Sequence, residues 1–331
     1  ARGLSDCLKA APGEVLSAAE VGSVLKVVTT LLEESLKRKA ENEEEKKAQA
    51  AEEGDAEDEA EDLEAEEEQN ENVRVALMEI LGSVMNKSKT AFVAASGFPI
   101  TSTIMQRFLQ AGASSADRSL ALYVACDLLE YLGAESVSIW PVFMDAMLTA
   151  VTDTDNQVRQ AACFGVNVAA RIPEFSQFSQ MAAQRLAQVV RSPNARTKKN
   201  LLATENAAAA LGWLVEKQPA ALGGSVADVA NVWLESLPLV EDEDEGQSSH
   251  SQLLRLVKAG GFQSPEQQAR LIKIFAQIFK KDNCDEATNL GILEIFRTLG
   301  RDGVTKLVTA VGKVSNKEKN QINRIFELIH M

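Results

Sequence analysis

Residues 139–172 read IWPVFMDAMLTAVTDTDNQVRQAACFGVNVAARI, and this stretch decides the fold. It opens with large apolar residues around Pro141, and a proline in the first turn of a helix costs no hydrogen bond. Asp153 and Asp155 then mark a turn, where Asp155 can accept hydrogen bonds from the free amides of a second helix. In that second helix, small and apolar residues recur every three or four positions at Val158, Ala162, Gly165, Val166 and Ala169. The stretch therefore predicts a helical hairpin.

The same hairpin recurs along the chain. Arg118 precedes its counterpart Arg159 by 41 residues, and Phe164-Gly165 is echoed by Leu211-Gly212, 47 residues later. Both spacings fit HEAT-type helix pairs, which repeat every 40 to 47 residues, roughly. We expect first helices near residues 21–40, 99–110, 139–151, 177–191, 226–236, 266–280 and 302–313, and second helices near 73–86, 117–132, 157–171, 198–216, 248–258, 286–299 and 318–330. Because one pair cannot bury its apolar stripe alone, residues 1–331 are predicted to form a single all-α solenoid of about seven pairs, a curved superhelix with a concave face.

The negative charge of the chain is concentrated in one segment. The whole chain has 331 residues and a formal charge of −14, whereas residues 41–71 hold 17 acidic residues against Lys46 and Lys47. Leu63 is the only large apolar residue of this segment, so we expect residues 41–72 to be an acidic insert, disordered or a frayed helix, between the two helices of one repeat. The rest of the chain is nearly neutral, which gives no reason to expect nucleic acid as a partner.

Residue types needed for catalysis or for metal binding are scarce. The four cysteines, Cys7, Cys126, Cys163 and Cys284, form no CxxC pair, and the only histidines are His250 and His330, which we expect on solvated helix surfaces. The sequence has no Gly-rich phosphate loop and no nucleophile elbow, so we expect neither an enzyme nor a cofactor. No apolar run is long enough to cross a bilayer. Without paired cysteines or a signal h-region we expect a reduced, intracellular protein, and because Ala1 stands where an initiator Met would, we expect a piece of a longer protein.

Three stretches resemble the C-terminal HEAT repeats of importin-β (karyopherin) nuclear transport receptors. They are residues 203–214, residues 233–242 and the segment that begins at Val158-Arg159, and the likeness extends over most of the chain. The resemblance implies a receptor that shuttles between cytoplasm and nucleus and grips basic protein cargo, such as segments of histones H3 and H4 or of ribosomal proteins, on a concave face. It also implies that Ran in its GTP form is held mainly by an N-terminal half outside this chain. Contacts with nucleoporins are left open.

Candidate cargo-binding residues lie opposite the apolar stripes of the second helices and in a second acidic run. On the helix near 117–132 they are Tyr123, Asp127 and Glu130, and one repeat later Asn167 takes an equivalent place. Glu205 and Asn206 stand where the previous repeat has Val158 and Arg159, with Trp213 close by as an aromatic anchor. The acidic run between two helices comprises Glu241, Asp242, Glu243, Asp244 and Glu245.

Each candidate also has a structural interpretation. Tyr123 and Trp213 fit a helix core, and Glu205 and Asn206 can bond the backbone or each other. The acids at 241–245 can stabilise a helix N-terminus, and the acidic insert can be a solubilising linker. Two other functions therefore stay open beside the transport receptor: an acidic histone-chaperone-like module, in which the insert itself binds, and a HEAT scaffold that joins subunits of a larger complex.

Overall fold

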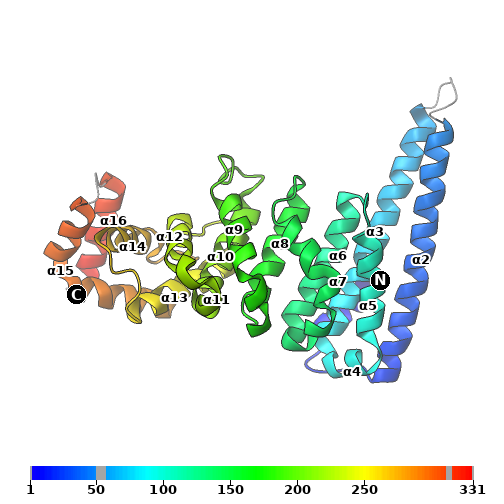
Figure 1. The fold of residues 1–331 in the computed structure, drawn as a ribbon, viewed down its shortest axis with the longest axis horizontal. Helices are drawn as coiled ribbons and strands as arrows, with labels where there is room; N and C mark the ends of the chain where they lie inside the picture. The colour runs from blue at the N-terminus through cyan, green and yellow to red at the C-terminus, as the bar shows by residue number, and fades with distance from the viewer. Residues whose placement is uncertain (1, 50–56, 311–314, 330–331) are drawn as a thin grey trace. The chain divides into compact units, whose positions relative to one another are not determined.

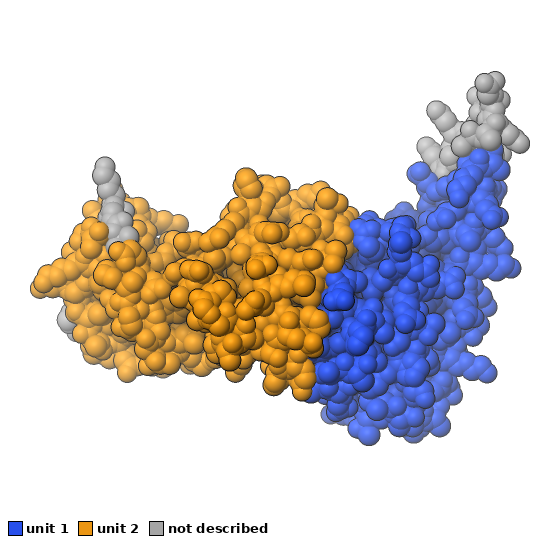
Figure 2. All heavy atoms as spheres, in the orientation of Figure 1, with its two compact units in different colours: residues 1–147 blue, residues 148–331 orange. Residues whose placement is uncertain are grey.

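The computed structural model describes residues 2–49, 57–310 and 315–329, and over these residues the regular structure is entirely helical (Figure 1). The chain divides into two compact units, residues 1–147 and residues 148–331, coloured separately in Figure 2. Within the described residues, no helix is both long enough and apolar enough to cross a membrane. The sequence-based prediction of an all-α chain is therefore confirmed.

Unit 1 consists of helices that pack in consecutive pairs. It contains α1 (Arg2–Ala10), α2 (Ala18–Gln49), α3 (Glu57–Lys87), α4 (Lys89–Ala94), α5 (Gly97–Phe108) and α6 (Ser115–Asp127). A π-helical turn, Leu128–Leu132, and a 3-10 helix, Gly133–Ile139, then lead into α7 (Trp140–Ala150), which crosses the boundary between the units. The pairs α2/α3 and α5/α6 agree with the predicted helices at 21–40, 73–86, 99–110 and 117–132.

Unit 2 continues the same pattern of helix pairs. It contains α8 (Asn156–Ala169), α9 (Ser179–Val190), α10 (Leu201–Lys217), α11 (Pro219–Leu222), α12 (Val226–Ser236), α13 (Glu243–Lys258), α14 (Pro265–Ile278), α15 (Glu286–Ala310) and α16 (Asn316–Ile329), with 3-10 turns at Pro173–Phe178 and Gly223–Ser225. Gly300, with φ of 67°, kinks α15 at the point where the sequence separates a helix at 286–299 from one that begins at 302. Most predicted helices therefore match, and their ends differ by a few residues.

The turn that was expected before α8 forms as predicted. Asp155 caps the helix, and its Oδ1 accepts hydrogen bonds from the backbone N–H of Gln157 at 2.9 Å and of Val158 at 3.1 Å. The repeated arginine has a structural role here, because Arg159 donates to the carbonyl of Asp153 and to the Oδ1 of Asn200, each at 2.6 Å. Arg159 thus ties the start of α8 to the start of α10.

The described residues of the acidic segment take the helical form, one of the two that the sequence left open. Residues 41–49 continue α2 and residues 57–72 belong to α3, while residues 50–56 lie outside the described part of the chain. Glu, Ala and Lys are strong helix formers, so two helices anchored in the fold can extend through this sequence. The anchor is a buried network in which Ser35 donates to Asn70 Oδ1 at 2.6 Å and the fully buried Arg74 pairs with Glu67 at 2.7 Å. Both long helices stand side by side in Figure 1.

Unit 2 has a close helix crossing at Gly212 of α10. A Cβ on Gly212 would lie 2.7 Å from the ring of Trp233 on α12 and 2.6 Å from Oε1 of Gln252 on α13. Trp233 is fully buried, so neither neighbour has room to withdraw. The glycine lets α10 pack directly against both helices, which sets the positions of the side chains one turn further along α10.

Candidate functional site

Three of the predicted residues occupy one side of the second helix in unit 1. Tyr123 and Asp127 belong to α6 and are four residues apart, which places them on the same face, and Glu130 follows in the next turn. Tyr123 is 43% exposed and Glu130 is exposed, whereas Asp127 is half-buried. The structure therefore places the three side chains on neighbouring turns, with Tyr123 and Glu130 exposed on either side of the half-buried Asp127.

A π-helical turn begins directly after Asp127. Residues Leu128–Leu132 adopt this geometry, which includes Glu130, while Leu128, Leu129 and Leu132 stay buried. Such turns are rare and occur disproportionately at functional sites, because the extra residue per turn re-aims side chains without ending the helix. Sequence periodicity does not reveal this turn, since the leucines fit an ordinary α-helix equally well.

Asp127 is held in an environment that opposes its ionisation. Its carboxylate abuts α3 at Gly82, and burial together with the charge of Glu130 raises its pKa to about 7, although Lys9 of α1 acts in the opposite direction. The same carboxylates raise the pKa of the neighbouring Cys126 and Tyr131, for which burial is the main cause. A carboxyl group so placed gains more from an added cation than an exposed one does.

A second group of predicted residues converges in unit 2, on α8, α10 and α13. Asn167 of α8 is fully buried, and its Nδ2 donates to Glu245 Oε2 at 2.9 Å, while its Oδ1 accepts from Arg171 at 3.3 Å. The guanidinium of Arg171 lies 4.7 Å from the centroid of the Trp213 ring, and Lys217 Nζ lies 5.7 Å from it. Trp213 is half-buried, so the ring is a partly exposed cation acceptor rather than a core residue.

Glu205 does not present its carboxylate to a partner, which corrects the prediction of a surface contact. It is fully buried on α10, and it accepts hydrogen bonds from three consecutive backbone N–H groups: Val240 at 2.7 Å, Glu241 at 3.0 Å and Asp242 at 3.2 Å. This is the structural interpretation that the sequence left open. Asn206 is also buried, at 8% exposure, and is corrected from a contact residue to a packing residue. Asn167 is buried too, but its Oδ1 contacts the exposed Arg171.

The acidic run at 241–245 is the start of a helix. Asp242 is the N-cap of α13 and accepts from the backbone N–H of Glu245 at 3.0 Å. Glu241, Glu243 and Asp244 are exposed, whereas Glu245 turns inward towards Asn167. Burial raises the pKa of Glu245, and Arg171 partly offsets this effect.

His250 is buried, contrary to the expectation of a solvated surface position; His330 lies outside the described residues. The Nε2 of His250 accepts from the backbone N–H of Leu239 at 3.2 Å, and the Nδ1 of His250 lies 2.7 Å from the carbonyl of Asn283, which assigns the proton to Nδ1. Burial lowers the pKa of His250 to about 4, so the ring is neutral near pH 7. It joins the loop before α13 to the loop before α15.

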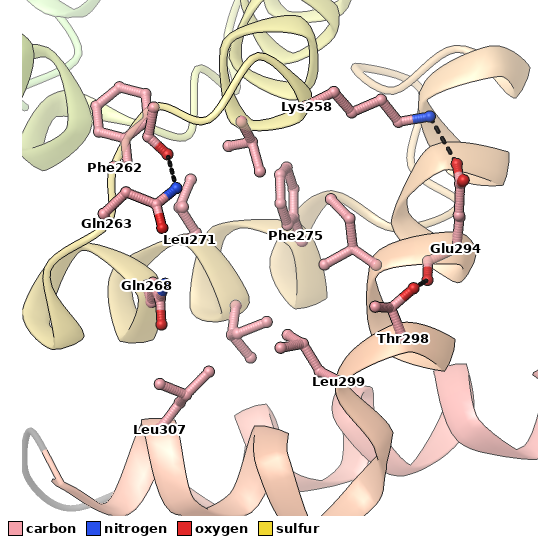
Figure 3. A pocket seen from close by; sticks show the side chains of 14 residues that line it. Lys258, Phe262, Gln263, Gln268, Leu271, Phe275, Glu294, Thr298, Leu299 and Leu307 are labelled. Carbon is pink, nitrogen blue, oxygen red and sulfur yellow. Dashed lines mark hydrogen bonds and ion pairs between the residues drawn. The ribbon is translucent and has the colours of Figure 1, made fainter.

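An apolar pocket of about 630 Å³ lies among α13, α14 and α15 (Figure 3). Leu271 and Phe275 of α14 and Leu299 of α15 form part of its wall, and Lys258 and Glu294 make an ion pair at its edge, 2.6 Å apart. No candidate from the sequence lines this pocket, because apolar residues at helical spacing look like core residues in a sequence.

Comparison with known proteins finds two similarities to importins. Residues 1–106 match the family model described as importin repeat 6. Importin subunit beta-3 of Saccharomyces cerevisiae (strain ATCC 204508 / S288c) is 25% identical over 140 residues, which cover 42% of this chain and 13% of that protein. About the first third of the chain is therefore similar to an importin repeat, and part of the chain is similar to an importin subunit.

Solved karyopherin structures share the fold of this chain. Kap121p bound to the SUMO protease Ulp1p matches with a TM-score of 0.68 at 18% identity, over 99% of this chain and 28% of that one. Kap121p bound to RanGTP matches with a TM-score of 0.65 at 15% identity, over 98% and 28%. The chain thus spans less than a third of the length of these proteins, and the likeness confirms the predicted α-solenoid.

Proposed function

We propose that this chain forms the part of a nuclear transport receptor that binds a basic segment of a protein cargo, with Tyr123, Asp127 and Glu130 as contacts. The observation that carries the proposal is the environment of Asp127, whose carboxyl is buried beside a second carboxylate. A cargo Lys or Arg placed between the two carboxylates offsets their mutual repulsion, and Tyr123 supplies an aromatic surface for the aliphatic part of that side chain.

The acidic segment contributes to the rate of association. Residues 41–49 and 57–72 extend the two helices next to α6, and exposed carboxylates lie within 41–48 and 62–72. Lys39 of α2 contacts Asp117 of α6 at 2.5 Å. The field of the exposed carboxylates attracts a basic ligand, but solvent ions screen it beyond about 8 Å at physiological salt. The segment therefore speeds encounter, and the α6 residues hold the ligand once it arrives.

Core histones and ribosomal proteins are the cargo classes proposed, and shuttling between cytoplasm and nucleus follows from the receptor role. Ran is proposed as a partner of the longer receptor, in line with the structure of Kap121p bound to RanGTP. The acidic histone-chaperone-like module remains the second candidate, because the carboxylates of α2 and α3 are numerous and exposed.

Calorimetric binding of a histone H3 tail peptide at two salt concentrations separates these functions. The key variant is D127N/E130Q, and the control is E43Q/E44Q/E45Q, which neutralises exposed carboxylates of α2 without touching the network around Ser35 and Asn70. The receptor proposal expects the first variant to lose most of its affinity at physiological salt and the second to lose little. If only the second loses affinity, the acidic helices are the binding element; if no protein binds, the cargo proposal is wrong.

A further inference from the structure

The Trp213 cluster of unit 2 has the composition of a cation site. The guanidinium of Arg171 contacts a partly exposed indole ring and the buried amide of Asn167, and that amide in turn donates to the carboxylate of Glu245. Rings flanked by carboxylate and amide oxygens are the arrangement that recognises Lys and Arg side chains. In this structure, the cation over the Trp213 ring is Arg171 of the protein itself.

Arg171 is held loosely for a residue so placed. Its side chain is exposed, its hydrogen bond to Asn167 is 3.3 Å long, and it makes no ion pair of 4 Å or less among the described residues. Long exposed side chains held by single weak contacts exchange partners on a nanosecond timescale. Displacing Arg171 from the ring therefore costs little beyond the cation–π contact itself.

The rest of the cluster is rigid and keeps an unused acceptor. Asn167 is fully buried, and Glu205 and Asp242 fix the start of α13 through backbone hydrogen bonds. Glu245 uses Oε2 to accept from Asn167, whereas its Oε1 is buried without a hydrogen-bond partner among the described residues. The carboxylate thus remains available to attract whichever cation lies over the ring.

We propose that Trp213, Asn167 and Glu245 form a second cation site for basic cargo, which Arg171 fills in the free protein, and that a cargo Lys or Arg enters by taking the place of Arg171 over the ring. This inference rests on the proposed function, since it assumes a basic ligand. Because Arg171 fills this second site in the free protein, the affinity of the site for isolated cations is lowered. The site therefore favours ligands that are already held elsewhere on the chain.

The test compares R171A with K217A, using the histone H3 tail peptide as the probe. Both variants remove one positive charge beside Trp213, but only R171A vacates the closer position over the ring. We expect R171A to bind the peptide about two- to fivefold more tightly than K217A, which is the fold-change of an exposed cation–π contact. In a W213L background, where the ring is missing, this difference should disappear.

Tryptophan fluorescence gives the independent readout. Trp140 and Trp233 are buried at 2% and 0% exposure, so a change on peptide binding that is lost in W213L reports on Trp213. The inference is overturned if R171A and K217A bind the peptide with equal affinity, or if the fluorescence of Trp213 does not change at saturating peptide. If Trp213 is silent while D127N/E130Q still weakens binding, the proposed function stands and this second site does not.

Discussion

The carboxylate of Asp127 lies so close to the backbone of Gly82 that a Cβ at Gly82 would be 2.3 Å from Asp127 Oδ2. This contact joins α6 to α3 and buries a charged group beside Glu130. The affinity proposed for basic cargo and the stability of unit 1 both depend on it, because the same burial that raises the pKa of Asp127 makes a ligand cation favourable.

Replacing Gly82 by alanine should displace the Asp127 side chain and destabilise the protein by about 1–3 kcal/mol, the usual cost of overpacking. Denaturant unfolding measures this cost. In D127A/G82A the obstructing carboxylate is absent, so G82A should cost clearly less there than in the wild-type background. Equal costs in both backgrounds would show that the two residues do not contact each other.

D127N should stabilise the protein at neutral pH. The pKa of Asp127 is about 7 in the folded chain, against an ordinary value of 3.8 in the unfolded chain. The folded state therefore binds more protons between these two pH values, and the unfolding free energy of the wild type falls as pH rises from one to the other. The advantage of D127N should therefore grow from pH 4 to pH 7 and level off above, with an upper bound of about 4 kcal/mol. Thermal unfolding of both proteins across this range checks it, and a pH-independent difference contradicts it.

His250 should give the opposite dependence. Its pKa of about 4 in the folded protein lies below the ordinary value of 6.5, so the neutral ring stabilises fully above pH 6.5, and this stability is lost as pH falls towards 4. Relative to H250Q, wild type should lose about 2 kcal/mol between pH 7 and pH 5. Taking the difference between the two proteins cancels the other titrating groups, Asp127 included. A constant difference would mean that His250 is not buried as a neutral ring.

E205Q should weaken unit 2 without weakening cargo binding. A glutamine offers one acceptor oxygen in place of the carboxylate that receives three backbone N–H groups, which leaves at least one of them unsatisfied at a cost of about 1–3 kcal/mol. Amide exchange of residues 240–242 should accelerate accordingly. E243Q, which removes an exposed charge from the same loop region, serves as the control. Lower peptide affinity in E205Q with unchanged exchange would restore Glu205 as a contact residue.

The helices were predictable because each is marked by local signals. Pro141, the Asp155 cap and the spacing of Val158, Ala162 and Ala169 lie within one hairpin, and the structure follows them closely. The grouping of Tyr123, Asp127 and Glu130 was predictable for the same reason, since helical periodicity alone places them together.

The errors come from contacts distant in sequence. Glu205 is buried because a loop 35 residues away brings three amides to its carboxylate, and His250 is buried because Leu239 and Asn283 approach it from two sides. No pattern near either residue signals this. For the acidic segment, composition left disorder and a frayed helix open, because it does not show that α2 and α3 are anchored to each other at Ser35 and Asn70 and extend into the segment.

The most direct test of the account is the pH dependence of binding for a basic, N-acetylated peptide without histidine. Asp127 has a pKa of about 7, and a bound cation lowers that pKa, so binding should release a proton and tighten as Asp127 ionises. Calorimetry should find about tenfold higher affinity at pH 8 than at pH 6, the ratio of ionised fractions for such a group. The same titration of D127N should be flat. An affinity of the wild type that does not change with pH, or changes equally in D127N, would contradict the claim that Asp127 holds the cargo cation.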